Sequence, residues 1–474
     1  MNPFKKISAH TLFLLLPLAG LFGAQTKPNI IYILADDLGY GDLSFLGQEK
    51  FQTPNIDKLA AKGMFFEQHY SGSTVCAPSR SALLSGQHTG HTYVRGNKEV
   101  MPEGQHPIPA EITLLPEMLR EAGYVSGIFG KWGLGYPGSV GEPLKKGFDV
   151  FYGYNCQRLG HHYYPYHLWD NEKKVMLDAN VGEAKGTYAP TLIHDRTLKF
   201  IEDNKDRPFF CYVASIIPHA ELVAPEPYME QFRGKLPEVK KYKGLDSGPE
   251  LRLGVYQSQD EPRTAFAAMI ALLDDQVGEI VAKTEVLGIA DNTLIIFTSD
   301  NGAHKEGGAD PKFFDSNGQY RGHKRDLYEG GVHVPMIAYW PGHVAAGSTS
   351  KHISAFWDMV PTFTELAGVA TPEDTDGVSM LPTLLGQGEQ AQHKYLYWEF
   401  HAAGGRIAVR KGKWKGVRYN VLKQPNRQME LYDLEKDPGE TKNLAAAYPE
   451  VVQAIRAIMK QARTPSELFQ FGRQ

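Results

Sequence analysis

The chain has 474 residues, of which 42% are hydrophobic and 22% are charged, and its net charge is −4. This composition is typical of a globular protein of about two domains. It does not favour a nucleic-acid-binding protein, which usually carries an excess of basic residues. Any chemistry on anions must therefore come from a local cluster of cationic side chains.

The N-terminal segment is predicted to be a secretory signal peptide. Lys5 and Lys6 precede an apolar run over residues 11–24, which is too short for a comfortable membrane span. We place the signal peptide at residues 1–24 and expect an exported protein, either periplasmic or secreted. An uncleaved membrane anchor is the alternative. No later stretch of the sequence is long and apolar enough to predict a stable membrane span.

Apolar segments alternate with helical patterns along most of the chain. Strands are predicted at residues 29–34, 124–129, 209–216, 293–298 and 334–339. Helices are predicted at residues 54–63, 114–123 and 265–287. This alternation predicts an α/β domain over residues 25–374, with a mostly parallel or mixed central sheet and helices on both faces.

The pattern changes near residue 375. Four short strands in close succession are predicted at residues 395–400, 406–410, 414–418 and 430–434. A helix follows at residues 450–461. Residues 375–474 are therefore predicted to form a smaller C-terminal α+β subdomain, an antiparallel sheet with one helix.

Charged or titratable residues follow four of the predicted strands. In an open α/β sheet, ligands bind beyond the carboxyl ends of the strands, and parallel strands bring those ends to one edge. The residues at these ends are Asp36 and Asp37, Lys131, His219, and Asp300 with Asn301. Taken singly, each aspartate reads as a loop or helix cap. Together, the four oxygen donors predict a site for a hard cation, Ca²⁺ or Mg²⁺, rather than for zinc.

Cys76 differs from the other candidate residues, because it is predicted to lie directly before a helix rather than after a strand. Pro78 favours the first turn of a helix, so Cys76 is predicted to lie just before a helix N-terminus, a location that attracts anions. A reactive thiol is one interpretation. A soft thiolate is, however, a poor partner for a cation with oxygen ligands. That conflict disappears if Cys76 is chemically modified in the mature protein.

The order of these motifs resembles the formylglycine-dependent type I sulfatases, arylsulfatase-like enzymes of the alkaline phosphatase superfamily. The matching signature is Cys-x-Pro-Ser-Arg, and the resemblance extends over nearly the whole mature chain. The matching segments are residues 28–31, 36–37, 53–57, 76–80, 130–132, 298–302, 321–324, 329–331, 431–434, 437–438 and 443–444.

The resemblance implies a mechanism. Cys76 would be oxidised to 3-oxoalanine (formylglycine) by a formylglycine-generating enzyme or an anaerobic sulfatase-maturating enzyme. Its hydrated side chain would bind one Ca²⁺ ion through one oxygen and attack sulfur, and its second hydroxyl would later eject sulfate. The metal ligands would be Asp36, Asp37, Cys76 in its modified form, Asp300 and Asn301.

The remaining cationic residues match positions that hold sulfate in this family. Lys131 and Lys324 would hold the sulfate oxygens and stabilise the charge that develops in the transition state. Arg80 would neutralise the formylglycine oxygens, and His219 would protonate the leaving alcohol. As isolated residues, such side chains are usually surface charges or structural histidines.

One departure from the family pattern puts part of this mechanism in doubt. The family usually has Gly-Lys-Trp-His-Leu-Gly, whereas this chain has Gly133 in place of the histidine that is expected to assist formylglycine turnover. We expect His161 or His162, which lie among aromatic residues, to enter the site and contact substrate. The alternative is an aromatic surface loop with incidental histidines, or an impaired enzyme.

The predicted function is hydrolysis of sulfate esters on an extracellular sulfated glycan. Galactose or N-acetylgalactosamine units are the expected sugars. Two other functions stay open from the sequence: a phosphate or phosphonate ester hydrolase of the same superfamily, and a non-catalytic glycan-binding relative. Retention of Cys76, Arg80, both lysines and all the predicted metal ligands argues against the second.

Overall fold

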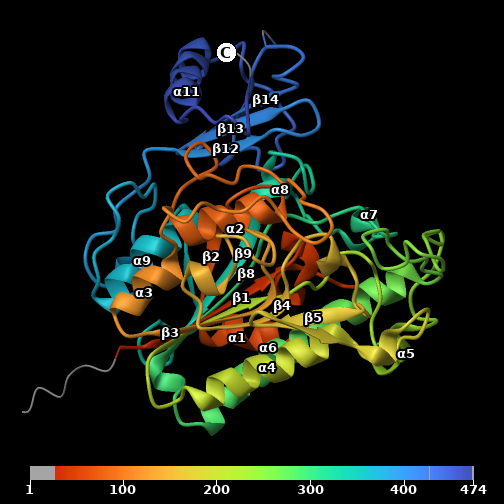
Figure 1. Cartoon of the computed structure of the whole chain (residues 1–474). Helices are drawn as coiled ribbons and strands as arrows, with labels where there is room; N and C mark the ends of the chain where they lie inside the picture. Colours follow the sequence, from red (N-terminus) through yellow and green to blue (C-terminus); the bar gives the residue numbers. More distant parts are fainter. Residues whose placement is uncertain (1–26, 426, 472–474) are drawn as a thin grey trace, which may run out of the picture.

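The computed structural model describes residues 27–425 and 427–471. The predicted signal peptide lies outside these residues. A large α/β part forms most of the molecule, and a small sheet with one helix lies against one end of it (Figure 1). Within the described ranges, no helix combines the length and the apolar character needed to cross a membrane.

A mixed sheet runs through the large part. Its strands are, in spatial order, β10 (Ser348–Ser350), β2 (Met64–Tyr70), β9 (His333–Tyr339), β8 (Thr293–Ser299), β1 (Asn29–Ala35), β7 (Phe209–Ala214), β3 (Val125–Lys131), β4 (Val150–Tyr154), β5 (His167–Asp170) and β6 (Lys173–Met176), and β11 (Ser354–Ala355) pairs with β2. Strands β8, β1, β7, β3 and β4 are mutually parallel. Strand β9 is antiparallel to β8 and β2, and β5 is antiparallel to β4 and β6. The predicted mixed central sheet is confirmed.

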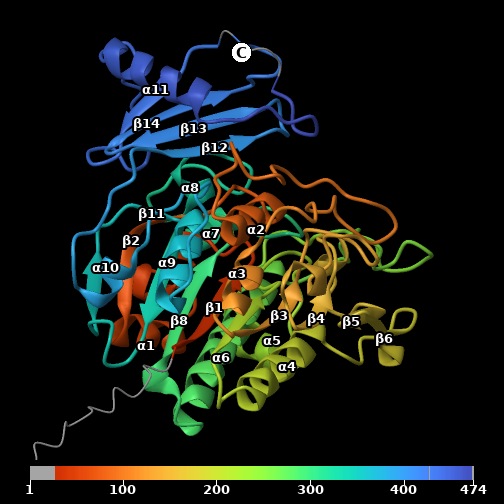
Figure 2. The ribbon, with the colours of Figure 1, turned by 60° about the vertical axis from the view of Figure 1, so that its left-hand side comes forward.

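Helices cover both faces of this sheet (Figure 2). One face carries α1 (Pro54–Lys62), α4 (Ala189–Asp203), α5 (Glu226–Phe232) and α6 (Pro262–Val286), and the other carries α2 (Cys76–Ser85), α3 (Leu115–Glu121) and α9 (Met359–Ala367). Side chains alternate along β1 because successive residues of a strand point to opposite faces. Ile31 and Ile33 pack with the α6 side, whereas Ile30 and Tyr32 pack with the α9 side. Burial on both faces explains why the strand reads as a continuous apolar run.

The C-terminal part is a four-stranded antiparallel sheet. Its strands are β12 (Leu396–Phe400), β13 (Arg406–Lys411), β14 (Trp414–Tyr419) and β15 (Glu430–Asp433), in that order. Helix α11 (Pro449–Gln461) packs on one face through Ile455 and Met459. The other face packs on the large part, where Trp398 joins a cluster that contains Val75 and Trp357.

A buried ion cluster joins the two parts. The Nζ of Lys415 on β14 lies 2.7 Å from Glu329 and 3.3 Å from Glu440, and all three side chains are almost fully buried. Tyr70 donates a hydrogen bond to Glu329 at 2.6 Å. Glu329 begins the short helix α8 (Glu329–Val332), which follows the segment that carries Lys324. The C-terminal sheet is thus tied to a segment of the large domain that carries a predicted site residue.

Replacement of Lys415 by methionine is expected to lower the free energy of unfolding by about 3–5 kcal/mol, because it leaves Glu329 buried without its cation. Thermal and urea denaturation would measure this change. Lys413→Met is the matched control: Lys413 pairs with Asp433 at 2.9 Å but lies at the surface, so stability should change little. Equal effects of the two substitutions would contradict the prediction.

Candidate active site

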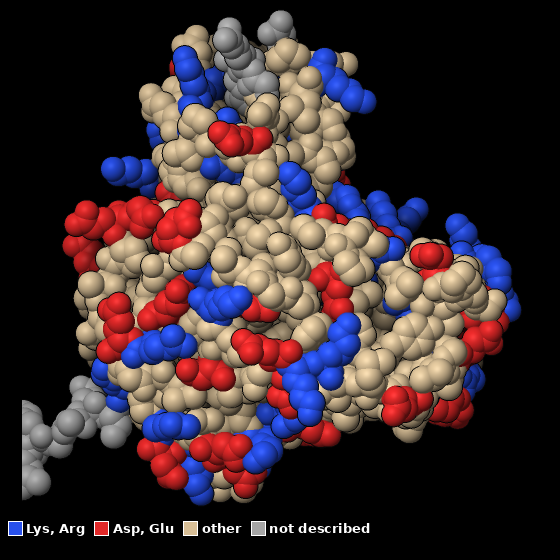
Figure 3. All heavy atoms as spheres, in the orientation of Figure 1, with Lys and Arg blue, Asp and Glu red and all other residues tan. Residues whose placement is uncertain are grey.

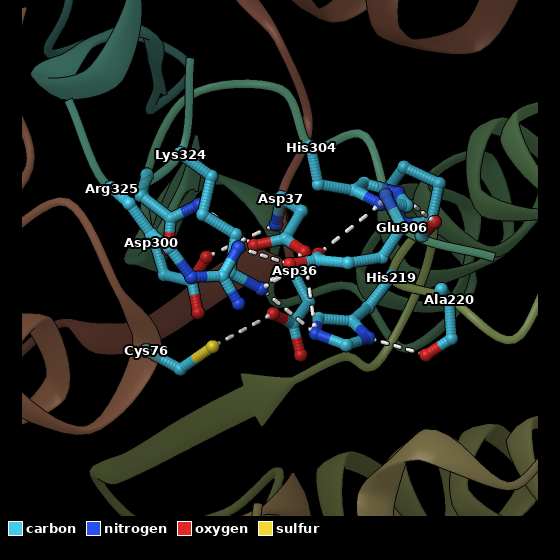
Figure 4. Close-up of polar contacts among 12 residues, drawn as sticks. Asp36, Asp37, Cys76, His219, Ala220, Asp300, His304, Glu306, Lys324 and Arg325 are labelled. Carbon is cyan, nitrogen blue, oxygen red and sulfur yellow. Dashed lines mark hydrogen bonds and ion pairs between the residues drawn. The ribbon is translucent and has the colours of Figure 1, made fainter. Parts of the chain in front are cut away.

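The carboxyl ends of four parallel strands meet at one edge of the central sheet, as the sequence predicts. Asp36 and Asp37 follow β1, Asp300 and Asn301 follow β8, Lys131 ends β3, and His219 follows β7. Helix α2 brings Cys76 and Arg80 to the same edge, and a loop between α7 (Pro311–Phe314) and α8 brings Lys324. Figure 4 shows Cys76, His219 and Lys324 directed toward the aspartates.

Four of the five predicted metal ligands, Asp36, Asp37, Asp300 and Asn301, form a fully buried group of oxygen donors. The backbone N–H of Asp37 donates to Asp300 at 3.1 Å, and the Nδ2 of Asn301 donates to Asp37 at 2.7 Å. Asp37 adopts a left-handed φ of 66°, which aspartate tolerates better than most residues. The Oδ1 of Asn301 is buried and has no hydrogen-bond partner among the described residues. An all-oxygen set with an unpaired amide oxygen fits a hard divalent cation.

Buried cations balance the carboxylates. The Nζ of Lys131 pairs with Asp36, and the Nζ of Lys324 pairs with Asp37 at 2.7 Å. Burial tends to raise the pKa of Asp36, but Lys131, His219 and Arg80 bring it well below its usual range. Burial and the nearby Asp36 raise the pKa of Asp300 to about 7. A concentrated, water-excluded set of cations of this kind suits an anionic substrate. On the exterior face in Figure 3, in contrast, acidic and basic side chains are interspersed.

Cys76 is the first residue of α2, whereas the sequence predicted that it would precede the helix. Pro78 therefore occupies the third helical position, and every residue of α2 is buried. The Sγ of Cys76 lies 3.4 Å from Asp36. Burial and the carboxylate of Asp36 raise the pKa of this thiol above its usual range.

Arg80 follows Cys76 by about one helical turn, so its side chain lies on the same face of α2. Its guanidinium donates to the backbone oxygen of Lys131 at 2.8 Å and lies 3.0 Å from Asp300. It also lies 3.7 Å from Asp36. Arg80 thus connects the α2 N-terminus to three of the strand ends.

His219 is the middle ring of a stack of three histidines. His161 lies on one side, with ring centroids 4.5 Å apart and an interplanar angle of 8°, and His304 on the other, at 5.7 Å and 10°. The Nδ1 of His219 donates to the backbone oxygen of Ala220, so its Nε2 is the acceptor for Lys324 at 2.9 Å. Burial and Lys324 lower the pKa of His219 well below its usual value. His219 and Lys324 thus form one proton-holding pair.

Of the two predicted substrate histidines, the structure brings only His161 to the site. The Nδ1 of His161 is buried and unpaired within the described part of the chain. His162 faces elsewhere: its Nε2 accepts from the N–H of Gly254 at 2.8 Å, and its Nδ1 lies 3.3 Å from Glu221. Both nitrogens of His162 are engaged in the protein, which favours a structural role rather than substrate contact.

Sequence reasoning missed His304 and Glu306. Glu306 lies 3.4 Å from Lys324 and also pairs with Arg325. Both residues follow Asn301 within five positions, so their nearness to a strand end was the available signal. That signal is weak, because residues of a strand-end loop can turn toward or away from the sheet edge.

Comparison with known proteins agrees with this geometry. The family model for sulfatases matches residues 28–369, and that for the C-terminal region of N-sulphoglucosamine sulphohydrolase matches residues 318–465. The chain is 32% identical to N-acetylgalactosamine-6-sulfatase of Homo sapiens, with 93% of this chain and 87% of that protein covered. It is 33% identical to arylsulfatase A of Homo sapiens, with coverage of 94% and 89%.

Solved structures share the fold. The crystal structure of Ps i-CgsB in complex with k-i-k-neocarrahexaose superposes with a TM-score of 0.77 and 28% identity, covering 92% of this chain and 93% of that one. The family match spans well over half of the chain and includes every residue of the buried site. The chain therefore belongs to the sulfatase family and is a hydrolase of sulfuric esters.

Proposed function

We propose that this enzyme removes sulfate from glycans through a formylglycine made from Cys76 and one bound Ca²⁺ ion. The observation that carries the proposal is the position of Cys76, which is buried at the start of α2 and within 3.4 Å of an aspartate of the oxygen-donor group. An unmodified thiol is poorly matched to a hard cation, whereas an oxygen nucleophile is well matched.

Asp36, Asp37, Asp300 and Asn301 would hold the ion. When bound, calcium would lower the pKa of the oxygen nucleophile at position 76 and offset the carboxylate charge. Calcium accepts six to eight oxygen ligands in flexible geometry, so it suits a group that combines three carboxylates with an amide oxygen better than zinc does.

The protein's own side chains supply the other roles. Lys131 and Lys324 bind sulfate oxygens and offset the charge that develops on them. Arg80 stabilises negative charge beside residue 76 and keeps α2 in place against the strand ends. A proton held between the Nε2 of His219 and the Nζ of Lys324 is available to the departing alcohol.

His161 is the residue that compensates for Gly133. Its ring is stacked on His219, and its unpaired Nδ1 is free to accept or donate a proton in the site. His161→Ala is expected to lower kcat about 10²-fold, a typical loss for a proton-transferring side chain. His162→Ala should instead lower the melting temperature, since it removes the bond to Gly254. Steady-state kinetics and thermal melts of both variants test this assignment, and full turnover by the His161 variant would refute it.

The proposed substrate is a sulfated carbohydrate with galactose or N-acetylgalactosamine units. Support comes from the relatives named N-acetylgalactosamine-6-sulfatase and N-acetylgalactosamine-6-O-sulfatase and from the k-i-k-neocarrahexaose in the complex of Ps i-CgsB. We further propose that the enzyme is exported and that a sulfatase-maturating enzyme oxidises Cys76. The apolar N-terminal segment of the sequence supports export.

Mass spectrometry of the tryptic peptide that contains residue 76, from protein made in the native host, tests the proposal. Conversion of the thiol to an aldehyde lowers the peptide mass by about 18 Da. Metal analysis of the same sample should find one calcium per chain. A panel of sulfate and phosphate monoesters should show turnover of the sulfates. Unmodified cysteine in active enzyme, or a preference for phosphate, would overturn it.

A further inference from the structure

The loop after β4 runs beside the loop that carries Gly133. Strands β3 and β4 are parallel, and the pairing continues past their ends: the N–H of Trp132 donates to Tyr154 at 2.9 Å and the N–H of Gly133 donates to Asn155 at 3.1 Å. Further along the same loop, Gly160 packs against Lys131. A Cβ at position 160 would lie 2.9 Å from the Cδ of Lys131. Residues 155–161 therefore form a wall beside the sulfate-binding lysine.

Gln157 fills the space that a side chain at position 133 would enter. Gly133 has a φ of +89°, and a Cβ built on it would collide with the amide of Gln157, with the Cδ at 2.8 Å. The absence of a side chain at Gly133 is thus matched by a side chain from the neighbouring loop. A larger residue at position 133 would displace the amide of Gln157.

The amide of Gln157 is buried and unsatisfied. The side chain is only 2% exposed, yet neither its Nε2 nor its Oε1 has a hydrogen-bond partner among the described residues. A buried amide without partners is costly, so such a group in a natural protein calls for a partner that completes it, such as a ligand or an ordered water. Both ends of this amide are free among the described residues, so a single group that completes it would both donate and accept hydrogen bonds.

A hydroxyl group satisfies that requirement, whereas a sulfate offers only acceptors and already has Lys131 and Lys324. We propose that Gln157 binds a hydroxyl group in the active site. The inference rests on the proposed function, because two hydroxyl sources follow from it: the sugar that bears the sulfate, or the hydrated aldehyde at position 76. In either case Gln157 is a binding residue and exchanges no proton.

Stability separates this role from a structural one. Gln157→Met keeps the approximate volume and removes an unsatisfied amide, so the melting temperature should stay unchanged or rise. Gln48→Met is the matched control. Gln48 is equally buried, but its Nε2 donates to Gly41 at 3.0 Å and to Phe314 at 2.7 Å. That substitution should lower the melting temperature by several degrees and leave turnover intact.

Kinetics and binding then identify the hydroxyl. If it belongs to the sugar, Gln157→Met should lower kcat/KM about tenfold on a sulfated galactoside and leave 4-nitrophenyl sulfate turnover unchanged. In the inactive Cys76→Ala background, it should also weaken binding of the sulfated galactoside about tenfold in calorimetry. If the hydroxyl belongs to residue 76, both substrates should slow equally, and an aldehyde-reactive hydrazide should label the variant faster.

The proposal fails if Gln157→Met lowers the melting temperature as Gln48→Met does. It also fails if the variant changes neither kcat/KM on either substrate, nor the affinity for the sugar, nor the rate of hydrazide labelling. These failures differ from failure of the proposed function, which would show in the wild-type enzyme. If the wild-type protein contains formylglycine and hydrolyses 4-nitrophenyl sulfate, the proposed function stands even when the Gln157 variants show no effect.

Discussion

Replacement of Cys76 by alanine is expected to abolish turnover, with kcat lowered by more than about 10³-fold. The substitution removes the side chain from which the proposed nucleophile is made, and that side chain lies beside Asp36 at the start of α2. The change in volume is small, so the helix should stay buried. Release of sulfate from 4-nitrophenyl sulfate, followed by ion chromatography, measures the loss. Calcium content should stay near one ion per chain, since the aspartates and Asn301 remain.

Cys211→Ala is the matched control for this experiment. Cys211 lies in the middle of β7, fully buried in the core and paired with Ile31 of β1 and Gly127 of β3 rather than at the strand ends. Its substitution should cost stability through a small cavity and leave kcat near the wild-type value. Retention of more than a tenth of the activity by Cys76→Ala would show that another residue supplies the nucleophile.

Removal of the divalent cation is expected to have the second largest effect. Dialysis against EGTA should lower activity more than about 10²-fold and should also lower the melting temperature, because three buried carboxylates then repel one another with only the lysines and Arg80 to offset them. Calcium should restore both properties, and zinc should not. Activity assays and calorimetry on the same dialysed sample provide the measurement.

Two aspartate variants test whether Asp300 is a calcium ligand. Asp300→Asn removes one buried carboxylate of the donor group and should weaken calcium binding, read by titration calorimetry. Asp274→Asn is the control, since Asp274 is equally buried but accepts bonds from Asn55 and Ile56 at the α1–α6 contact. Full activity in metal-free protein would remove the metal from the mechanism, whereas equal calcium affinity in both variants would remove Asp300 from the set of ligands.

The sequence predicted the site residues at the strand ends well, because the order and direction of the strands alone bring these residues together. Once β1, β8, β7 and β3 are parallel neighbours, Asp36, Asp300, His219 and Lys131 must share an edge. The hairpin β5–β6 was not predicted, because its strands are four residues long and partly exposed and so lack a clear apolar period. Helix positions fixed by tertiary packing, such as the start of α2 at Cys76, were predicted only to within a residue.

Side-chain direction in loops was beyond sequence reasoning. His161 and His162 are adjacent and chemically identical, yet one ring stacks on His219 and the other bonds Gly254 and Glu221. The direction of each ring depends on the short helical turn Leu159–His161, which ends between the two histidines. Gln157 carried no signal in the sequence either, because its significance depends on a missing side chain at Gly133 in a different loop.

The C-terminal sheet contacts the loop after Lys324, so substitutions in this sheet should affect the active site from a distance. Arg406 pairs with Asp326 at 2.7 Å, the hydroxyl of Tyr419 accepts from the N–H of Leu327 at 3.0 Å, and Lys415 holds Glu329. A substitution in the small sheet would therefore disturb the segment that directly follows Lys324, in addition to lowering the free energy of unfolding. In an activity screen, such a variant would combine lower stability with weaker sulfate binding, although its altered residue lies outside the active site.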